Sequence, residues 1–388
     1  MVTYPIEQLS DLQTEGKMEI IPDNSSVTIT TRKITKVLVT GANGQLGRCI
    51  SDIYSKNVVV TDRDTLSTNI PEFIFVTHND LDICNAREVS SFISSNNIDC
   101  VVNCAAYTNV DKAEECFYNA YLVNTIGTEV LGTVCANLGV YLIHISTDYV
   151  FNGKKLGKYD TQDSTDPRSI YGLTKADGES ALETIFNLET WGHRKKDGNE
   201  HKPCGCTVIR TQWLYSEHGN NFFTKMWGLI DNSYRSSLCD HSKDFSPYIS
   251  VVDDQHGTPT YAGSLAEFIV RYVTYGNIEI KERYKIIHFS DEGESTWFDF
   301  AKAIESFFIQ NIDFDDIPDR SFVIPVSTNY YNEYIAMRKS ANRPERSTLD
   351  HSSLEGLTFR PNYLGYKPDH WMINLAKCVK KFLLKKEK

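Results

Sequence analysis

Short apolar runs alternate with amphipathic stretches from Lys36 onward. The apolar runs are rich in β-branched residues and have the length of strands, whereas the stretches between them repeat apolar positions at helical spacing. Strands that alternate with helices predict parallel strands joined by right-handed crossovers. We therefore predict an α/β fold with a doubly wound parallel sheet. The predicted strands are Lys36–Thr40, Val58–Thr61, Phe73–Val76, Val101–Cys104 and Val140–Ile145, and the predicted helices are Gln45–Tyr54, Ala86–Ser95 and Ala113–Leu138.

The alternation loosens after Ser180, where we predict a smaller α/β lobe. Polar residues with Gly and Pro predict a surface insertion over 191–205, and residues 1–33 lack periodicity. The expected elements of the second half are helices over Ser264–Tyr275, Thr296–Phe308 and Trp371–Leu384 and a strand over Lys285–Phe289. We expect an extension over 1–33, a first domain mainly over 34–206 and the smaller lobe mainly over 207–388, with the chain crossing between the lobes.

The charge and the cysteines narrow the function classes. The 388 residues carry 40 Lys+Arg and 51 Asp+Glu, a net charge of −11, so neither nucleic acid nor anionic lipid is an expected partner. No window approaches the roughly 18 apolar residues of a membrane span, and no apolar signal region begins the chain. Ten scattered cysteines do not form a disulfide framework, which favours a cytoplasmic protein. Cys204 and Cys206 lack a second ligand pair, so no metal is expected there.

A three-glycine turn follows the first predicted strand and opens the first predicted helix, with the sequence Gly41-Ala-Asn-Gly44-Gln-Leu-Gly47. Glycines permit a tight turn, the close approach of a pyrophosphate and close packing of helix on strand. The free N–H groups at the helix start favour an anion. The turn therefore predicts a Rossmann-type dinucleotide site formed by Gly41, Asn43, Gly44, Gln45, Leu46 and Gly47.

Two acidic positions are candidates for binding the adenosine half of such a cofactor. Asp62 ends the second predicted strand, 21 residues after Gly41, where a carboxylate accepts from a ribose 2′-hydroxyl and favours NADH. Arg63 beside it would instead pair with a 2′-phosphate and admit NADPH. Asp82 and Ile83 follow the third predicted strand and are expected to hold the adenine.

A tyrosine and a lysine four residues apart begin another predicted helix, so Tyr171 and Lys175 share one face. An unperturbed phenol is a poor acid at pH 7, and a neighbouring ammonium stabilises its phenolate. Thr147 follows the buried run Val140–Ile145 at a carboxyl end of the sheet, where ligands bind. Thr147 and Tyr171 are therefore expected to meet a substrate carbonyl, with hydride from NADPH or NADH and a proton from Tyr171.

Neighbouring residues complete the predicted site. Ala105, Ala106 and Tyr107 follow the fourth predicted strand, and small residues there leave room for a cofactor ribose. Two histidines, His144 and His256, raise the alternative of a histidine-based dehydrogenase. No Asp/His pair can be placed for either, and His144 lies in a buried run, so we expect it to be a core residue.

Seven motifs in order identify a family resemblance over about Thr35 to Leu384. They are VLVTGANGQLG, DCVVNCAAYTNVDKAE, HISTDYVFNG, SIYGLTKADGE, VIRTQWLYSEHGNNF, VVDDQHGTPTYA and RPERSTLD. The chain resembles the extended short-chain dehydrogenase/reductases and, within them, the dTDP-4-dehydrorhamnose reductases. The resemblance implies reduction of the 4-keto group of dTDP-4-dehydro-L-rhamnose to dTDP-L-rhamnose, with NADPH or NADH as cofactor.

The resemblance also assigns roles by position. The catalytic threonine, tyrosine and lysine fall on Thr147, Tyr171 and Lys175, and Arg210 and Arg343 are expected near the substrate lobe. Some members carry a glutamate that contributes to a metal-linked dimer where this chain has Cys49, so no such metal site is predicted, and a monomer or a homodimer is expected. The substrate-binding residues implied are Thr108, Thr147, Tyr149, Trp213, Asn221, Gln255 and Thr258.

Two other functions are compatible with this pattern. The β subunit of methionine adenosyltransferase is similar and acts as a non-catalytic binding partner, but the retained segment Asp254–Thr260 and the intact stretch Arg210–Tyr215 favour an enzyme. A bifunctional UDP-sugar epimerase/reductase is the other alternative, although no separate epimerase domain is recognisable.

Overall fold

The computed structural model describes residues 31–32, 34–55, 70–187, 204–239, 248–275, 278–279, 282–312, 321–336, 341–355, 357–360, 363–364 and 366–386. The strand predicted at 58–61, nearly all of the extension and most of the predicted insertion lie outside these residues.

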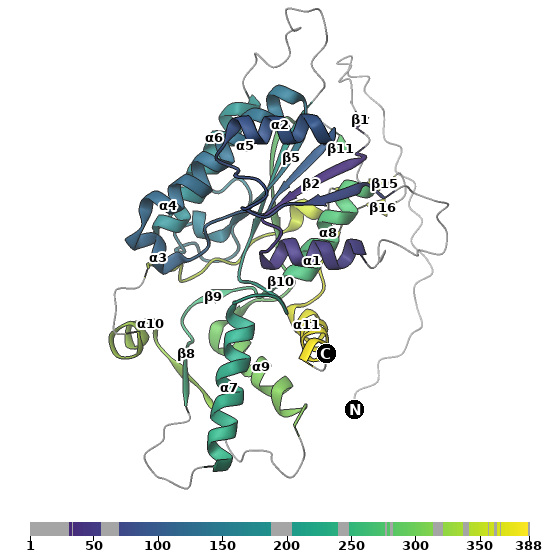
Figure 1. The fold of residues 1–388 in the computed structure, drawn as a ribbon. Helices are drawn as coiled ribbons and strands as arrows, with labels where there is room; N and C mark the ends of the chain where they lie inside the picture. Colours follow the sequence, from purple (N-terminus) through teal and green to yellow (C-terminus); the bar gives the residue numbers. More distant parts are fainter. Residues whose placement is uncertain are drawn as a thin grey trace, which may run out of the picture.

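The largest sheet in the described part of the chain has six strands, and all of its neighbouring pairs are parallel (Figure 1). The strand order is β12-β6-β5-β4-β2-β3. The α/β doubly wound class predicted from the alternating pattern is confirmed. The strands are β2 (Lys36–Thr40), β3 (Glu72–Phe75), β4 (Cys100–Asn103), β5 (Tyr141–Thr147), β6 (Cys206–Thr211) and β12 (Tyr284–Phe289).

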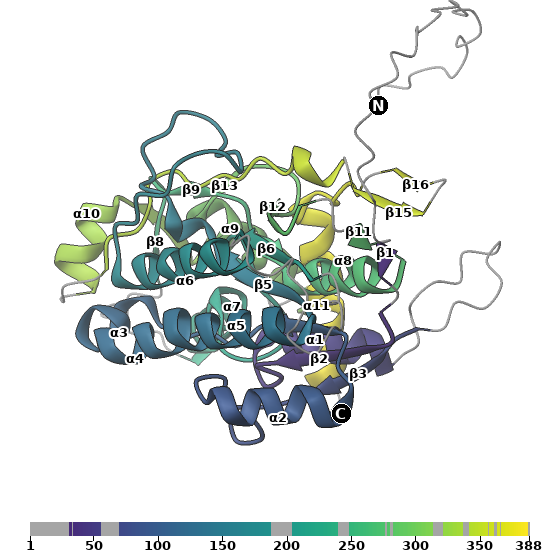
Figure 2. The same cartoon turned by 90° about the horizontal axis from the view of Figure 1, so that it is seen from above.

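Helices cover both faces of the sheet, which is why its strands are apolar throughout rather than alternating. Alternate residues of one strand serve the two faces: Val37 and Val39 pack toward one helix layer and Leu38 toward the other. The first layer holds α1 (Gln45–Ser55) and α8 (Ala262–Tyr275), which lie against each other (Figure 2). The second layer holds α2 (Ala86–Asn96), α5 (Gly127–Leu138) and α6 (Ile170–Asn187).

The single helix predicted over Ala113–Leu138 is wrong. Cys116 leaves the helical region with φ −127° and ψ 61°, and the segment divides into four pieces. Apolar positions continue at helical spacing through the break, so periodicity alone does not reveal it. The pieces are α3 (Val110–Glu115), α4 (Phe117–Tyr121), the π-helical turn η1 (Leu122–Ile126) and α5.

A second cluster of apolar side chains lies beyond the carboxyl ends of the strands, where α7 (Phe222–Cys239), α9 (Trp297–Ile309) and α11 (Trp371–Lys386) gather below the sheet in Figure 1. A parallel pair, β8 (Ile249–Val252) and β14 (Val323–Val326), packs with them. After α8 the chain returns to the large sheet as β12, at its edge. The boundary predicted at residue 206 stays a prediction.

Short elements complete the described structure. They are β1 (Thr31–Arg32), η2 (Asp148–Val150), β7 (Leu214–Tyr215), β9 (His256–Gly257), β10 (Thr260–Tyr261), β11 (Ile278–Glu279), β13 (Ser295–Thr296), α10 (Thr328–Tyr330), η5 (Tyr331–Ile335), η6 (Ser352–Leu354), β15 (Thr358–Arg360) and β16 (Tyr363–Leu364). Among the described residues, none of the helices combines the length and apolar character that crossing a membrane requires.

Candidate active site

The glycine turn joins β2 to α1 and brings the backbone close to its neighbours. Gly41 has φ +66°, and a Cβ there would lie 2.6 Å from the backbone nitrogen of Ala105. A Cβ on Gly47 would lie 2.6 Å from the carbonyl oxygen of Gly41, so the third glycine lets the helix approach the strand. The turn therefore has the two close approaches for which such glycines are required.

A cavity of about 590 Å³ opens at the start of α1, beyond the carboxyl ends of the strands. It brings together the glycine turn, the end of β5 and the first turns of α6, as a doubly wound sheet places its ligands. The predicted site residues that line it are Asn43, Gly44, Gln45, Leu46, Ala106, Thr108, Thr147, Tyr149, Tyr171, Lys175, Trp213 and Asn221.

Thr147 and Tyr171 meet in this cavity, from the last residue of β5 and the first turn of α6. Burial raises the pKa of Tyr171 to about 12, although a hydrogen bond with Thr147 opposes the rise. The Tyr149 ring stands edge-on to the Tyr171 ring, with centroids 5.5 Å apart. Tyr171 therefore carries its proton at neutral pH and can act as a proton donor.

Lys175 is almost fully buried one turn after Tyr171. Its Nζ donates to the carbonyl oxygen of Ile145 at 2.7 Å and lies 3.0 Å from Nε2 of His144. Burial lowers the pKa of Lys175 to about 8, and Glu179 opposes that change. We expected Lys175 to lower the pKa of Tyr171. In this structure the pKa of Tyr171 is raised instead, because burial has the largest effect on it.

The predictions for the adenosine half of the cofactor, at Asp62 and Arg63, stay predictions. Asp62 and Arg63 lie outside the described residues. β2 has β4 on one side and β3 on the other. The N–H of Ala42, in the glycine turn, donates to the carbonyl oxygen of Val76, which directly follows β3. In a doubly wound sheet, the residue that meets the ribose follows the strand beside the one that carries the glycine turn. Here that strand is β3, and the residues that follow it include Thr77 and His78.

Asp82 and Ile83 are not among the described residues that line the cavity. Asp82 Oδ1 accepts from the backbone N–H of Cys84, and Ile83 is buried. Their assignment to the adenine stays a prediction.

The chain after β4 is fixed by two asparagines. Asn103 accepts from the N–H of Ala105, and Asn124 accepts from the N–H of Tyr107 and donates to its carbonyl oxygen. Ala106 and Thr108 line the cavity, whereas Ala105 and Tyr107 are not among its described lining residues.

A second cavity, of about 670 Å³, adjoins the first and shares Asn221, Phe222 and Trp297 with it. Trp213 has φ +43°, and its ring stacks on Trp297 at 3.7 Å with the planes 9° apart. Asn221 donates to the carbonyl oxygens of Ser216 and His218, which fixes the loop before α7. The stacked rings of Trp213 and Trp297 thus lie where the first cavity adjoins the second.

Gln255 and Arg343 line the second cavity, not the first. Gln255 donates to Thr328 Oγ1 at 3.0 Å, and Arg343 pairs with Asp111 at 3.0 Å. Thr258 is buried and donates its N–H to Gln212, and it is not among the described residues that line either cavity. Its expected substrate contact therefore stays a prediction.

Arg210 is not among the described residues that line these two cavities, and its expected place near the substrate lobe stays a prediction. Its guanidinium binds both carboxylate oxygens of Glu179, at 2.7 and 3.1 Å, and lies over the Phe151 ring. The side chains are 3% and 4% exposed. Arg210 thus stabilises the contact between β6 and α6 as a buried ion pair.

Several residues of the site escaped sequence reasoning. Asp148 is buried, accepts from Thr147 Oγ1 at 3.0 Å, and has its pKa raised by burial to about 6. Gln212, directly after β6, and Trp297, at the start of α9, line the first cavity. The position of Asp148 directly after Thr147 was a usable signal, but no spacing along the chain connects Trp297 to the site.

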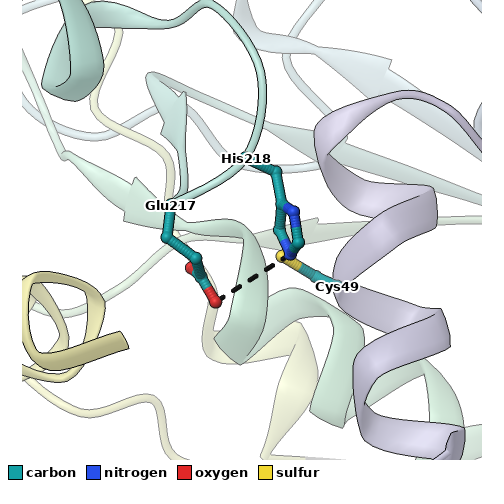
Figure 3. Close-up of side chains that lie close together, drawn as sticks. All are labelled: Cys49, Glu217 and His218. Atoms are coloured by element: carbon teal, nitrogen blue, oxygen red, sulfur yellow. Dashed lines mark ion pairs between the residues drawn. The ribbon is translucent and has the colours of Figure 1, made fainter. Parts of the chain in front are cut away.

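Cys49 has two neighbours able to bind a metal, Glu217 and His218, with ligand atoms within 4.8 Å of one another (Figure 3). Two lysines already supply positive charge: Lys381 lies 3.8 Å from Glu217, and Lys385 lies 3.0 Å from Nε2 of His218. The prediction that no metal binds here stays a prediction.

The family model of the RmlD substrate binding domain matches residues 35–384. A dTDP-4-dehydrorhamnose reductase of Aggregatibacter actinomycetemcomitans is 31% identical over 338 residues, 87% of this chain and 96% of that protein. The crystal structure of a Clostridium acetobutylicum dTDP-4-dehydrorhamnose reductase superposes with a TM-score of 0.66 at 30% identity, covering 90% of this chain and 100% of that one. A Bacillus anthracis dTDP-4-dehydrorhamnose reductase in complex with NADP gives 0.66 at 28%, with the same coverage. The resemblance seen in the motifs is thereby confirmed, and the chain belongs to the dTDP-4-dehydrorhamnose reductase family.

Proposed function

We propose that this protein reduces the 4-keto group of a nucleotide-linked 4-keto-6-deoxy sugar with NADPH or NADH, and that it converts dTDP-4-dehydro-L-rhamnose to dTDP-L-rhamnose. The observation that carries the proposal is the meeting of Thr147, Tyr171 and Lys175 in one cavity with the glycine turn. Membership of the family, whose named members are reductases of dTDP-linked keto sugars, supports it.

The residues present fit a dinucleotide. The start of α1 offers free N–H groups to a pyrophosphate, and the backbone around Gly41 and Gly47 is too close to admit side chains. Lys175 Nζ contacts His144 and the carbonyl oxygen of Ile145, and its remaining side faces the cavity, where it can hydrogen-bond a ribose hydroxyl. The bound cofactor supplies the hydride.

The protein itself moves the proton. Tyr171 Oη donates it to the oxygen of the carbonyl as hydride reaches the carbon, and the Thr147 hydroxyl hydrogen-bonds the same oxygen. Raising the pKa of Tyr171 keeps the phenol protonated until that moment. The ammonium form of Lys175 then stabilises the phenolate, and its pKa near 8 lets it hand over a proton.

The second cavity is proposed to hold the nucleotide of the sugar substrate. Its lining combines aromatic side chains, suited to a base, with the cations Lys225 and Arg343, suited to a pyrophosphate. Because the two cavities share Asn221 and Trp297, the sugar would lie where they meet, beside Tyr171.

We also propose that NADPH is preferred over NADH, because of the residues after β3. Asp80 is the carboxylate in this turn, and it already accepts from the N–H and hydroxyl of Thr77 at 2.8 and 2.6 Å. The exposed His78 is left to face a 2′-phosphate. His78→Asp should lower kcat/KM with NADPH relative to NADH on the order of tenfold, since a carboxylate repels the phosphate and accepts from a 2′-hydroxyl.

The control for His78→Asp is Asn79→Asp, which adds the same charge one residue further along the turn. Steady-state kinetics with both cofactors measures the ratio. An equal change in both variants would show that the charge acts at long range and would remove His78 from the cofactor site.

The purified wild-type protein tests the main proposal directly. Supplied with dTDP-4-dehydro-L-rhamnose, it should oxidise NADPH or NADH in proportion to the dTDP-L-rhamnose formed. Crossing both cofactors with dTDP- and UDP-linked 4-keto sugars identifies the base as well. No turnover with any pair, together with co-purification of an adenosyltransferase, would replace the enzyme by a binding subunit.

A further inference from the structure

A buried chain of polar side chains leads from Lys175 into the sheet, away from the cavity. Asn103 on β4 lies between Thr40 and His144, and His144 on β5 lies between Asn103 and Lys175. Thr40, Asn103 and His144 are each at most 1% exposed. Because these three side chains are buried from solvent, their hydrogen bonds are made with the neighbouring protein atoms.

The direction of every hydrogen bond in the chain follows from one backbone group. The N–H of Ala105 can only donate, and it donates to Asn103 Oδ1 at 3.1 Å. That contact fixes the amide, so Asn103 Nδ2 donates to His144 Nδ1 at 3.0 Å. Nδ1 then carries no proton, and the neutral ring must carry its proton on Nε2.

The consequence falls on Lys175. Its Nζ lies 3.0 Å from Nε2 of His144, which is a donor, and an ammonium has no lone pair with which to accept. The contact is favourable for the neutral amine, which accepts from His144 and still donates to Ile145. Burial acts in the same direction, because it holds the pKa of His144 well below its usual range and lowers the pKa of Lys175.

We propose that His144 is a positioning residue for the reaction: held by Asn103 with its proton on Nε2, it orients Lys175 and stabilises the neutral amine that remains once the lysine has given its proton to the Tyr171 phenolate. The neutral amine then regains a proton from solvent water in the cavity that Lys175 lines, which closes the proton balance. The inference rests on the proposed function for its catalytic meaning, but the tautomer and the hydrogen bond exist without any substrate.

Other titratable groups also affect the pKa of Lys175, so a test variant must leave them unchanged. Glu179 lies on the next turn of α6 and is paired with Arg210, and the half-buried Cys104 follows β4. Tyr149 and Tyr171 share the cavity with Lys175. A variant that changes only the atom facing Lys175 is therefore needed.

Two variants that are isosteric with each other provide that change. In His144→Gln the side-chain oxygen accepts from Asn103 and the amide N–H faces Lys175, as Nε2 does now, so the pH profile of kcat/KM should match wild type. In His144→Glu an acceptor faces Lys175 and favours the ammonium. The pKa in the kcat/KM profile that reports Lys175 should therefore rise by about one unit or more. His288→Gln is the matched control, since His288 is equally buried on β12 and bonds only backbone carbonyls among the contacts described.

Two measurements test the role of His144 without any catalytic turnover of a substrate. Nitrogen-15 NMR of the histidine-labelled, cofactor-free protein should show His144, assigned by its loss in His144→Gln, as the neutral Nε2–H tautomer. The pH dependence of NADPH affinity should shift in His144→Glu but not in His288→Gln. A proton on Nδ1, or equal profiles for the Gln and Glu variants, would overturn the inference. If wild type reduces no 4-keto sugar, the proposed function fails while these two measurements still decide the role of His144.

Discussion

Tyr171→Phe is expected to lower kcat by about 10²- to 10⁴-fold, the range contributed by a positioned general acid. The change removes one oxygen from a buried side chain and leaves the ring in its place against Tyr149. Hydride transfer to a carbonyl whose oxygen receives no proton leaves an alkoxide in a site with little water, which is the cost the phenol avoids. Stopped-flow or steady-state oxidation of NADPH measures the loss.

The matched control is Tyr149→Phe, because both phenols line the same cavity with their rings 5.5 Å apart. Cofactor affinity should stay close to wild type in both variants, since neither ring forms the glycine turn. We expect Tyr149→Phe to affect KM for the sugar more than kcat. The reverse pattern, with kcat lost only in Tyr149→Phe, would transfer the proton-donor role to Tyr149.

The fold was predictable because its signal is local and repeated. Each strand of the sheet is a short apolar run, and each crossover helix has an apolar stripe, so the alternation predicts the parallel sheet. The break at Cys116 was not predictable on these grounds, because the apolar spacing continues through α3, α4 and η1. A single residue outside the helical region changes the backbone without changing the pattern.

The candidate site was predictable where chemistry and chain order coincide. The glycine turn, Thr147, Tyr171 and Lys175 each stand at the end of a strand or the start of a helix, and the structure brings them to one cavity. Strand neighbours are different, because sequence order does not say which strand lies beside β2. The pairing of β2 with β3 is what places His78 in the proposed cofactor site, whereas Asp62 stays a prediction.

The positively charged side chains of the sequence were the least reliable basis for predicting which residues meet a ligand. Arg210 ends a central strand, where a cation for the pyrophosphate was plausible, but α6 presents Glu179 to it. The sequence contains no mark that distinguishes an arginine facing a ligand from one that faces a carboxylate inside the fold. That difference has a large and measurable consequence for stability.

Arg210→Met is expected to lower the free energy of unfolding by about 3–5 kcal/mol. The variant leaves the Glu179 carboxylate buried, with its three hydrogen bonds from the guanidinium lost. The double variant Arg210→Met with Glu179→Leu should regain most of the loss, since removing both charges also removes the cost of burying them. Urea denaturation of the cofactor-free protein measures both.

A comparison with an exposed ion pair separates burial from charge. Arg235 pairs with Asp231 at 2.8 Å on α7, with the arginine side chain 73% exposed, so Arg235→Met should leave the urea midpoint close to wild type. If Arg210→Met is as mild as Arg235→Met, water must reach Glu179 in solution, and Arg210 would then be free to serve a ligand after all. A large loss that the double variant reverses instead assigns Arg210 to the contact between β6 and α6, and leaves Lys225 and Arg343 as the cations available to a substrate pyrophosphate.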